Sequence, residues 1–159
     1  GTFDDFGGKR DPGENHPGIT AAREFFEEAI LSETLNVTLP EVEKYIDINA
    51  GNTKNIIAHA KSVTYIIPFD DFLGKFIKNF YQARERVSKH HLREKDRIAL
   101  VKMKDIQDAI KANPKTVLNI TVRGIVINPQ TQKLQRQTII LRPFFVKKLQ
   151  PFFLDKKYY

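Results

Sequence analysis

Three glutamates on one turn of a predicted helix constrain this chain more than any other feature. Residues 21–28 read Ala-Ala-Arg-Glu-Phe-Phe-Glu-Glu, and most of these residue types favour the α-helix. In a helix, Glu24, Glu27 and Glu28 stand at i, i+3 and i+4 and share one face. Like charges at this spacing repel one another by roughly a few tenths of a kcal/mol when solvated, and by more when buried. We therefore expect some partner to offset the repulsion.

Two kinds of cation can offset it. Arg23 precedes Glu27 by four residues and can pair with it on the helix surface. Hard divalent cations such as Mg²⁺ and Mn²⁺ bind carboxylate oxygens, and Mg²⁺ commonly shares its ligands with substrate phosphates. The run alone is equally typical of a solvated acidic face, so metal binding needs support from the neighbouring residues.

The segment before the helix supplies that support. Gly7-Gly8 follows the apolar Phe6, and glycines let the backbone approach a ligand closely. Glu14 lies in the following loop, which Pro17-Gly18 ends with a turn. Thr20 is a plausible N-cap, so we predict a helix over residues 20–33.

Together these residues resemble the Nudix box, G-x5-E-x7-R-E-U-x-E-E-x-G-U, in which U is a bulky apolar residue. Eight of its nine fixed positions are filled, by Gly8, Glu14, Arg23, Glu24, Phe25, Glu27, Glu28 and Leu31. Two positions depart from the pattern. Eight residues rather than seven separate Glu14 from Arg23, and Ile30 replaces the last glycine, which suggests that the helix continues through Ser32 or Glu33.

The resemblance implies an α/β (α+β) fold in which a mixed β-sheet lies between helices, and a single domain over residues 1–159. It implies hydrolysis of a phosphoanhydride in a nucleoside diphosphate derivative or similar polyphosphate, with Mg²⁺ or Mn²⁺. The implied metal ligands are a backbone carbonyl near Gly7 or Gly8, and Glu14 (alternatively an outer carboxylate), Glu24, Glu27 and Glu28. The implied catalytic residues are Glu27, Glu28, Arg23 and Glu94. Arg23 would orient Glu27, and Glu94 would come from a late loop. Lys9 and Arg10 follow the glycines and are candidates for binding phosphate, or are simply solvated.

Charge is distributed unevenly along the chain. Residues 1–50 hold four Lys/Arg and eleven Asp/Glu, a net charge of −7, whereas residues 51–159 hold 22 and 8, a net charge of +14. A basic half suits anionic partners such as nucleoside polyphosphates, capped RNA ends or inositol pyrophosphates, although nucleotide sugars and a merely basic surface remain open. Cysteine is absent, which excludes disulfides and thiolate zinc sites. No signal peptide or membrane-spanning run is visible, so we expect a cytoplasmic or nuclear protein with no membrane contact.

A non-catalytic Nudix-like module that binds RNA or a protein is the alternative function. The isoleucine, the loop insertion and the basic half favour it. Against it stands the complete set of carboxylates, because a site without a function has little reason to keep three repelling glutamates. A structural domain with an accidental acidic helix is a third class.

Hydrophobic periodicity and breakers predict the remaining elements. We expect a short strand at 2–6, helices at 40–48, 71–88, 105–112 and 143–154, strands at 55–67 and 97–103, and a hairpin formed by 116–127 and 133–142. Strands usually precede a Nudix box, and here almost none do. Either the hairpin at about 116–142 replaces them, as in a permuted chain, or it is a late addition and the opening strands lie outside the numbered chain. We favour the second, and the first requires the hairpin to pair beside residues 2–6.

Overall fold

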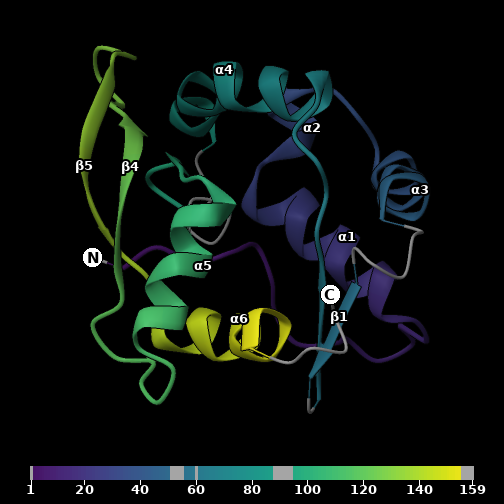
Figure 1. Cartoon of the computed structure of the whole chain (residues 1–159). Helices are drawn as coiled ribbons and strands as arrows, with labels where there is room; N and C mark the ends of the chain where they lie inside the picture. The colour runs from purple at the N-terminus through teal and green to yellow at the C-terminus, as the bar shows by residue number, and fades with distance from the viewer. Residues whose placement is uncertain (1, 51–55, 60, 88–94, 155–159) are drawn as a thin grey trace. The chain divides into compact units, whose positions relative to one another are not determined.

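The computed structural model describes residues 2–50, 56–59, 61–87 and 95–154 (Figure 1). In this part of the chain six helices and five strands form an α+β structure, which confirms the predicted fold class. The residues group into two compact units, of which the first comprises residues 1–5, 59–62 and 97–159 and the second comprises residues 6–58 and 63–96. Each unit is described by itself.

Four helices make up most of the second unit: α1 (Pro17–Glu28), α2 (Leu31–Thr34), α3 (Leu39–Asn49) and α4 (Asp71–Arg86). Helix α1 packs against α3, and α2 packs against α4. Thr38 and Glu41 form a capping box at the start of α3. Asp70 caps α4, because its carboxylate accepts a hydrogen bond of 2.9 Å from the backbone N–H of Leu73. Both helices were predicted close to these bounds.

Helix α1 starts earlier than the sequence predicted. Its N-cap is His16, whose Nδ1 accepts a hydrogen bond of 3.0 Å from the backbone N–H of Gly18, and Pro17 occupies the first turn. Thr20 is therefore not the N-cap but a buried residue inside the helix.

Helix α1 also ends earlier than predicted. It stops at Glu28, and Ile30 adopts the left-handed conformation with φ 53° and ψ 47° before α2 begins. The prediction that isoleucine lets the helix continue through Ser32 or Glu33 is wrong. Burial of the Ile30 side chain, which is 3% exposed, offsets the strain of a β-branched residue in this conformation. The chain thus breaks where the Nudix pattern has glycine.

An aromatic cluster forms much of the core of the second unit. The rings of Phe6, Phe25 and Phe76 lie 5.1 to 5.9 Å apart by their centroids, and Phe76 also contacts Phe80 at 5.5 Å. Phe25 and Phe80 are buried, as the helical spacing predicted. These contacts fix Phe6, and with it the start of the glycine loop, on α1 and α4.

The first unit contains a three-stranded antiparallel sheet in the order β3 (Ala99–Leu100), β4 (Thr121–Ile127) and β5 (Leu134–Ile140). Helix α5 (Met103–Ala112) packs on β4, and α6 (Pro143–Leu154) packs on α5 (Figure 1). Gly124 in β4 is required by close packing, because a Cβ there would overlap the side chain of Ile139. The predicted hairpin is confirmed, whereas the predicted strand at 97–103 shrinks to two residues.

The predicted single strand at 55–67 is wrong. The structure has two strands instead, β1 (Ile56–His59) and β2 (Ser62–Tyr65), which pair as a two-stranded sheet. The apolar, β-branched composition of this segment correctly indicated β-structure. It gave no turn signal, because Ala60 and Lys61 are not residues that favour turns.

The N-terminal segment of the first unit lies beside the end of the hairpin. Phe3 forms a parallel bridge with Leu141, with its N–H donating to Ile140 and its carbonyl accepting from Arg142, both at 2.8 Å. Asp4 pairs with Arg142 at 2.7 Å, and Asp5 pairs with Lys148 at 2.8 Å. The predicted strand at 2–6 is thus reduced to one bridge outside the named strands of the sheet, and the choice between the permuted arrangement and the late hairpin stays a prediction.

None of the described helices is both long enough and apolar enough to cross a membrane.

Candidate functional site

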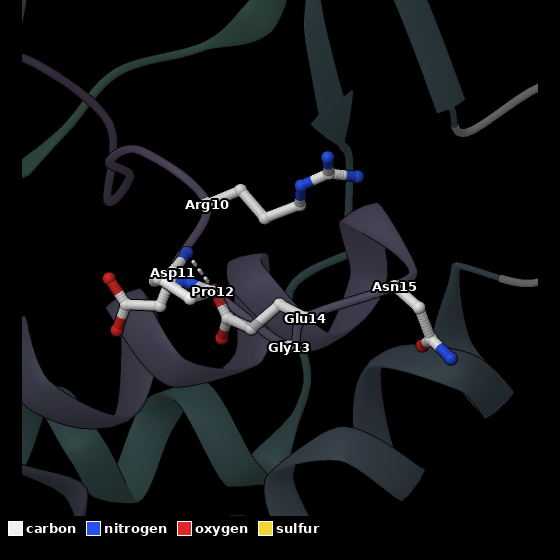
Figure 2. Close-up of a pocket in the computed structure, with 6 residues that line it drawn as sticks. All are labelled: Arg10, Asp11, Pro12, Gly13, Glu14 and Asn15. Carbon is white, nitrogen blue, oxygen red and sulfur yellow. Dashed lines mark hydrogen bonds between the residues drawn. The ribbon is translucent and has the colours of Figure 1, made fainter.

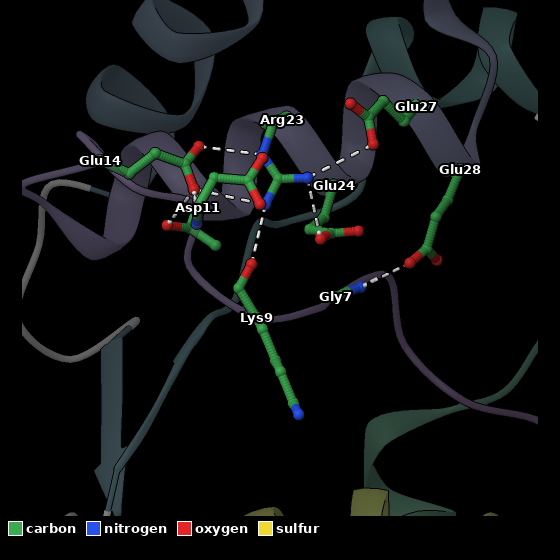
Figure 3. Close-up of polar contacts among 9 residues, drawn as sticks. Gly7, Lys9, Asp11, Glu14, Arg23, Glu24, Glu27 and Glu28 are labelled. Atoms are coloured by element: carbon green, nitrogen blue, oxygen red, sulfur yellow. Dashed lines mark hydrogen bonds and ion pairs between the residues drawn. The ribbon is translucent and has the colours of Figure 1, made fainter.

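The guanidinium of Arg23 is the centre of an ionic network on the outer face of α1 (Figure 3). It lies within ion-pair distance of four carboxylates: Asp11 (3.2 Å), Glu14 (2.9 Å), Glu24 (3.0 Å) and Glu27 (3.4 Å). One Nη also donates a hydrogen bond of 2.8 Å to the carbonyl of Lys9. Arg23 therefore offsets much of the repulsion between the glutamates and ties the glycine loop to the helix. The predicted contact between Arg23 and Glu27 is present.

Glu14 is fully engaged by the protein. Its carboxylate accepts hydrogen bonds from Arg23 at 2.9 and 3.3 Å, from the Thr20 hydroxyl at 3.1 Å and from the Asp11 N–H at 2.6 Å. These bonds, that from Arg23 above all, lower the pKa of Glu14 to about 2. Of the two roles considered for Glu14, its contacts favour that of an outer carboxylate that orients Arg23.

The end of the Glu24 side chain lies directly against the backbone of Gly8. A Cβ added at Gly8 would overlap all three terminal atoms of the Glu24 side chain, Cδ and both oxygens. Glycine at this position thus creates the space in which the Glu24 carboxylate lies. The Glu24 carboxylate therefore lies directly against the backbone of the glycine loop, and the role of this glycine as a metal ligand stays a prediction.

Glu28 differs from the other glutamates because it is buried, with 5% of its surface exposed. The solvated acidic face that the glutamate run alone suggested is therefore wrong for Glu28. Its Oε1 accepts a long hydrogen bond of 3.4 Å from the N–H of Gly7, and its Oε2 lies 3.3 Å from Nζ of Lys95. Burial raises the pKa of Glu28 to about 7, although Lys95 opposes this shift. Its Oε2 has no hydrogen-bond partner among the described residues.

Glu27 is the solvent-facing member of the set. Its side chain is 47% exposed, and its contact with Arg23 is the longest of the four. Figure 3 shows Glu27 turned away from the loop, whereas Glu28 points toward Gly7. The Glu27 carboxylate is therefore accessible to solvent.

The donor set suits Mg²⁺ or Mn²⁺, but it is not gathered around one point. No three of the described His, Asp and Glu side chains are arranged to hold a metal ion. Arg23 holds Glu14, Glu24 and Glu27, while Lys95 holds Glu28. The chemistry nevertheless fits a hard cation, because the donors are oxygens and one buried oxygen of Glu28 lacks a hydrogen bond.

The loop between the glycines and α1 forms a shallow pocket that is open to solvent. It is lined by Arg10, Asp11, Pro12, Gly13, Glu14 and Asn15 (Figure 2). The Arg10 side chain extends along one side of it, and Lys9 directs its carbonyl to Arg23 while its side chain stays exposed. Figure 3 shows the Lys9 side chain directed away from the carboxylates, so its backbone contacts the network and its ammonium group does not, and phosphate binding by Lys9 and Arg10 stays a prediction.

Glu94, the predicted additional catalytic carboxylate, lies outside the described residues. The next residue, Lys95, is a member of the site that the sequence analysis missed. Its carbonyl accepts a hydrogen bond of 3.0 Å from Nε of Arg84, which fixes this segment on α4. No local sequence pattern predicts the contact between Lys95 and Glu28, because the two residues are far apart in the chain and meet only through tertiary packing.

No protein-family model matches the chain, and searches of curated proteins and of solved structures gave no significant match.

Proposed function

We propose that the chain is a metal-dependent hydrolase that cleaves a phosphoanhydride in a nucleoside diphosphate derivative or a similar polyphosphate. The observation that carries the proposal is the placement of Glu24 and Glu28 against Gly8 and Gly7, with a buried Glu28 oxygen whose nearest described cation, Nζ of Lys95, lies 3.3 Å away. The proposal includes membership of the Nudix superfamily. The left-handed backbone at Ile30, where the motif has glycine, supports it.

Glu24, Glu28 and a backbone carbonyl of Gly7 or Gly8 would hold Mg²⁺ or Mn²⁺. Bound there, the ion supplies charge neutralisation for a diphosphate and lowers the pKa of water, so that hydroxide is accessible near neutral pH. Glu27, which faces solvent, accepts the proton of the attacking water. Lys9 and Arg10 neutralise phosphate oxygens from the loop.

Arg23 acts as a positioning residue in this scheme. Its fork-shaped guanidinium holds Glu24 and Glu27 through one nitrogen and Glu14 through others. Glu14 in turn is fixed by Thr20 and the Asp11 N–H, so the orientation is transmitted from the loop to the helix face. A lysine has no such fork and would lose part of this geometry.

The test is a substrate panel. Nucleoside diphosphate derivatives, capped RNA and inositol pyrophosphates are incubated with the chain and Mg²⁺ or Mn²⁺, and phosphate-containing products are measured. We expect metal-dependent cleavage of at least one class, reduced by orders of magnitude in Glu24→Gln. The exposed Glu33→Gln is the matched control and should retain activity. Cleavage that persists without metal or in Glu24→Gln argues against the assignment.

One observation favours the alternative of a non-catalytic module. The ionic network of Arg23 offsets the repulsion of Glu24 and Glu27 without any metal, so the glutamates have a structural role as well. The argument that only a working metal site would retain them is therefore weaker than the sequence suggested. Absence of cleavage across the panel, together with salt-sensitive RNA binding, would favour this alternative.

A further inference from the structure

We propose that Lys95 is a resident counterion of Glu28 which a divalent cation must displace, so that this lysine sets the metal affinity of the site. The inference rests on the proposed metal-dependent function. It names a positioning residue that the resemblance to the Nudix box does not include, because Lys95 lies far outside residues 8–31.

The first step of the argument is the burial of Glu28. A buried carboxylate is costly unless an opposite charge and hydrogen bonds compensate it. Glu28 has one long hydrogen bond from Gly7, and its other oxygen has none from the described residues. Its charge is therefore balanced chiefly by the ammonium group of Lys95 at 3.3 Å.

The second step is that this balance is incomplete. The distance of 3.3 Å is within ion-pair range, but it is longer than the roughly 2.7–2.9 Å of a strong charge-assisted hydrogen bond. A divalent cation provides twice the charge and a direct bond to the oxygen, so it satisfies Glu28 better than the lysine does. Glu24 is the neighbouring carboxylate whose charge also acts on Glu28.

The third step concerns how Lys95 is held. Its backbone is anchored to α4 by Arg84, and its side chain is 27% exposed. The ammonium group can therefore leave Glu28 by rotation of the flexible side chain, while the backbone remains in place. Both the anchor and the carboxylate belong to the second unit.

Titration with Mn²⁺ tests the inference, with the dissociation constant measured by electron paramagnetic resonance at pH 8. Lys95→Met should bind Mn²⁺ more tightly than the wild type by about fivefold or more, the lower range of coupling between two sites. Lys95→Arg should stay close to the wild type because it keeps the charge. Lys104→Met, which removes the same charge from an exposed pair with Asp108, is the matched control and should not change the affinity.

A second measurement uses the wild type alone, because loss of Lys95 leaves a buried charge and can unfold the chain. Amines are labelled with a reactive ester, with and without saturating Mn²⁺, and the modified lysines are identified by mass spectrometry. Labelling of Lys95 should rise on addition of Mn²⁺, while that of Lys104 stays constant.

The outcomes separate the two proposals. Mn²⁺ binding by the wild type with no gain in Lys95→Met, or with unchanged labelling of Lys95, overturns the counterion role and leaves the metal site standing. Absence of Mn²⁺ binding in both the wild type and a folded Lys95→Met variant overturns the metal site, and the counterion role with it. Binding by Lys95→Met alone supports the counterion role.

Discussion

At the level of single residues, the four glutamates of the site are neutralised in two different ways. Glu14, Glu24 and Glu27 share the guanidinium of Arg23, which remains partly accessible at the surface. Glu28 is buried and relies on Lys95. Glu27 and Glu28 are adjacent and equivalent in the motif, but the carboxylate of Glu27 is exposed and that of Glu28 is buried.

Glu28 should make the stability of the metal-free chain depend on pH. Its folded pKa of about 7 exceeds the reference value of 4.5, so the folded state binds more protons than the unfolded state between these values. This contribution is fully present below pH 4.5 and is lost as the pH rises through 7. Denaturant unfolding of wild type and Glu28→Gln should therefore show a fall in stability from pH 6 to 7.5 that the variant lacks.

The chosen pH range separates Glu28 from Asp5, a half-buried carboxyl whose pKa is also raised. Burial raises the pKa of Asp5 to about 6, so its own contribution changes mainly at lower pH. Equal slopes for wild type and Glu28→Gln between pH 6 and 7.5 would contradict the assigned burial of Glu28.

Gly8→Ala should move the Glu24 carboxylate without unfolding the chain. The added Cβ overlaps only the flexible end of that side chain, which can rotate away. We expect weaker Mn²⁺ binding and nearly unchanged unfolding free energy. Gly74→Ala is the matched control, because its Cβ meets nothing closer than 3.9 Å and α4 should gain about 0.5–1 kcal/mol. Unchanged Mn²⁺ affinity in Gly8→Ala would argue against Glu24 as a ligand.

At the level of elements, the end of α1 is where local sequence and structure disagree most. Isoleucine does not favour the left-handed conformation, so a continuing helix was the natural prediction. Ile30 nevertheless adopts φ 53°, and burial of its side chain compensates for the strain of this backbone conformation. Tertiary packing at Ile30 therefore overrides the preference of isoleucine for helical backbone, which is the only one of the two effects that the sequence reveals.

The conformation of Ile30 predicts an unusual order of stability. Ile30→Gly and Ile30→Ala both lose the buried side chain, but only alanine retains the left-handed strain, of about 1–2 kcal/mol. Chemical denaturation should therefore find Ile30→Gly more stable than Ile30→Ala by about 1 kcal/mol. At the exposed helical position Lys78 the order should reverse, as in any ordinary helix. An alanine advantage at position 30 would mean that α1 continues through it.

Phe25 anchors α1 in the aromatic core of the second unit. It is 7% exposed and its ring contacts those of Phe6 and Phe76. Phe25→Ala should lower the free energy of unfolding by about 3–5 kcal/mol in denaturant titration. Phe69→Ala removes the same atoms from a side chain that is 68% exposed, and should cost much less. Similar losses in both variants would refute the orientation of α1.

Across the whole molecule, the sequence predicted those elements that depend on interactions between residues close together in the chain. Helix α4 and the β4–β5 hairpin follow from apolar spacing, the Asp70 cap and turn residues, although β4 begins at Thr121 and not at residue 116 as predicted. The division of 55–67 into two strands was not predictable, because residues 60 and 61 are alanine and lysine and not glycine, proline or asparagine. Long-range contacts were equally hidden, among them the bridge between Phe3 and Leu141.

The candidate site shows the same division. Helical spacing correctly placed Arg23 beside Glu27, because that contact is internal to one helix. The burial of Glu28 and its pairing with Lys95 depend on packing between segments, which one sequence does not display. The central claim is that Glu24 and Glu28 together bind a divalent metal ion.

Mn²⁺ binding by the wild type, compared with the double variant Glu24→Gln/Glu28→Gln, tests this claim most directly. Free Mn²⁺ is measured by electron paramagnetic resonance at constant ionic strength, with the fold of both proteins checked by circular dichroism. The account predicts saturable binding by the wild type that the folded double variant loses. Equal binding by the two proteins, or no binding by the wild type, would contradict it.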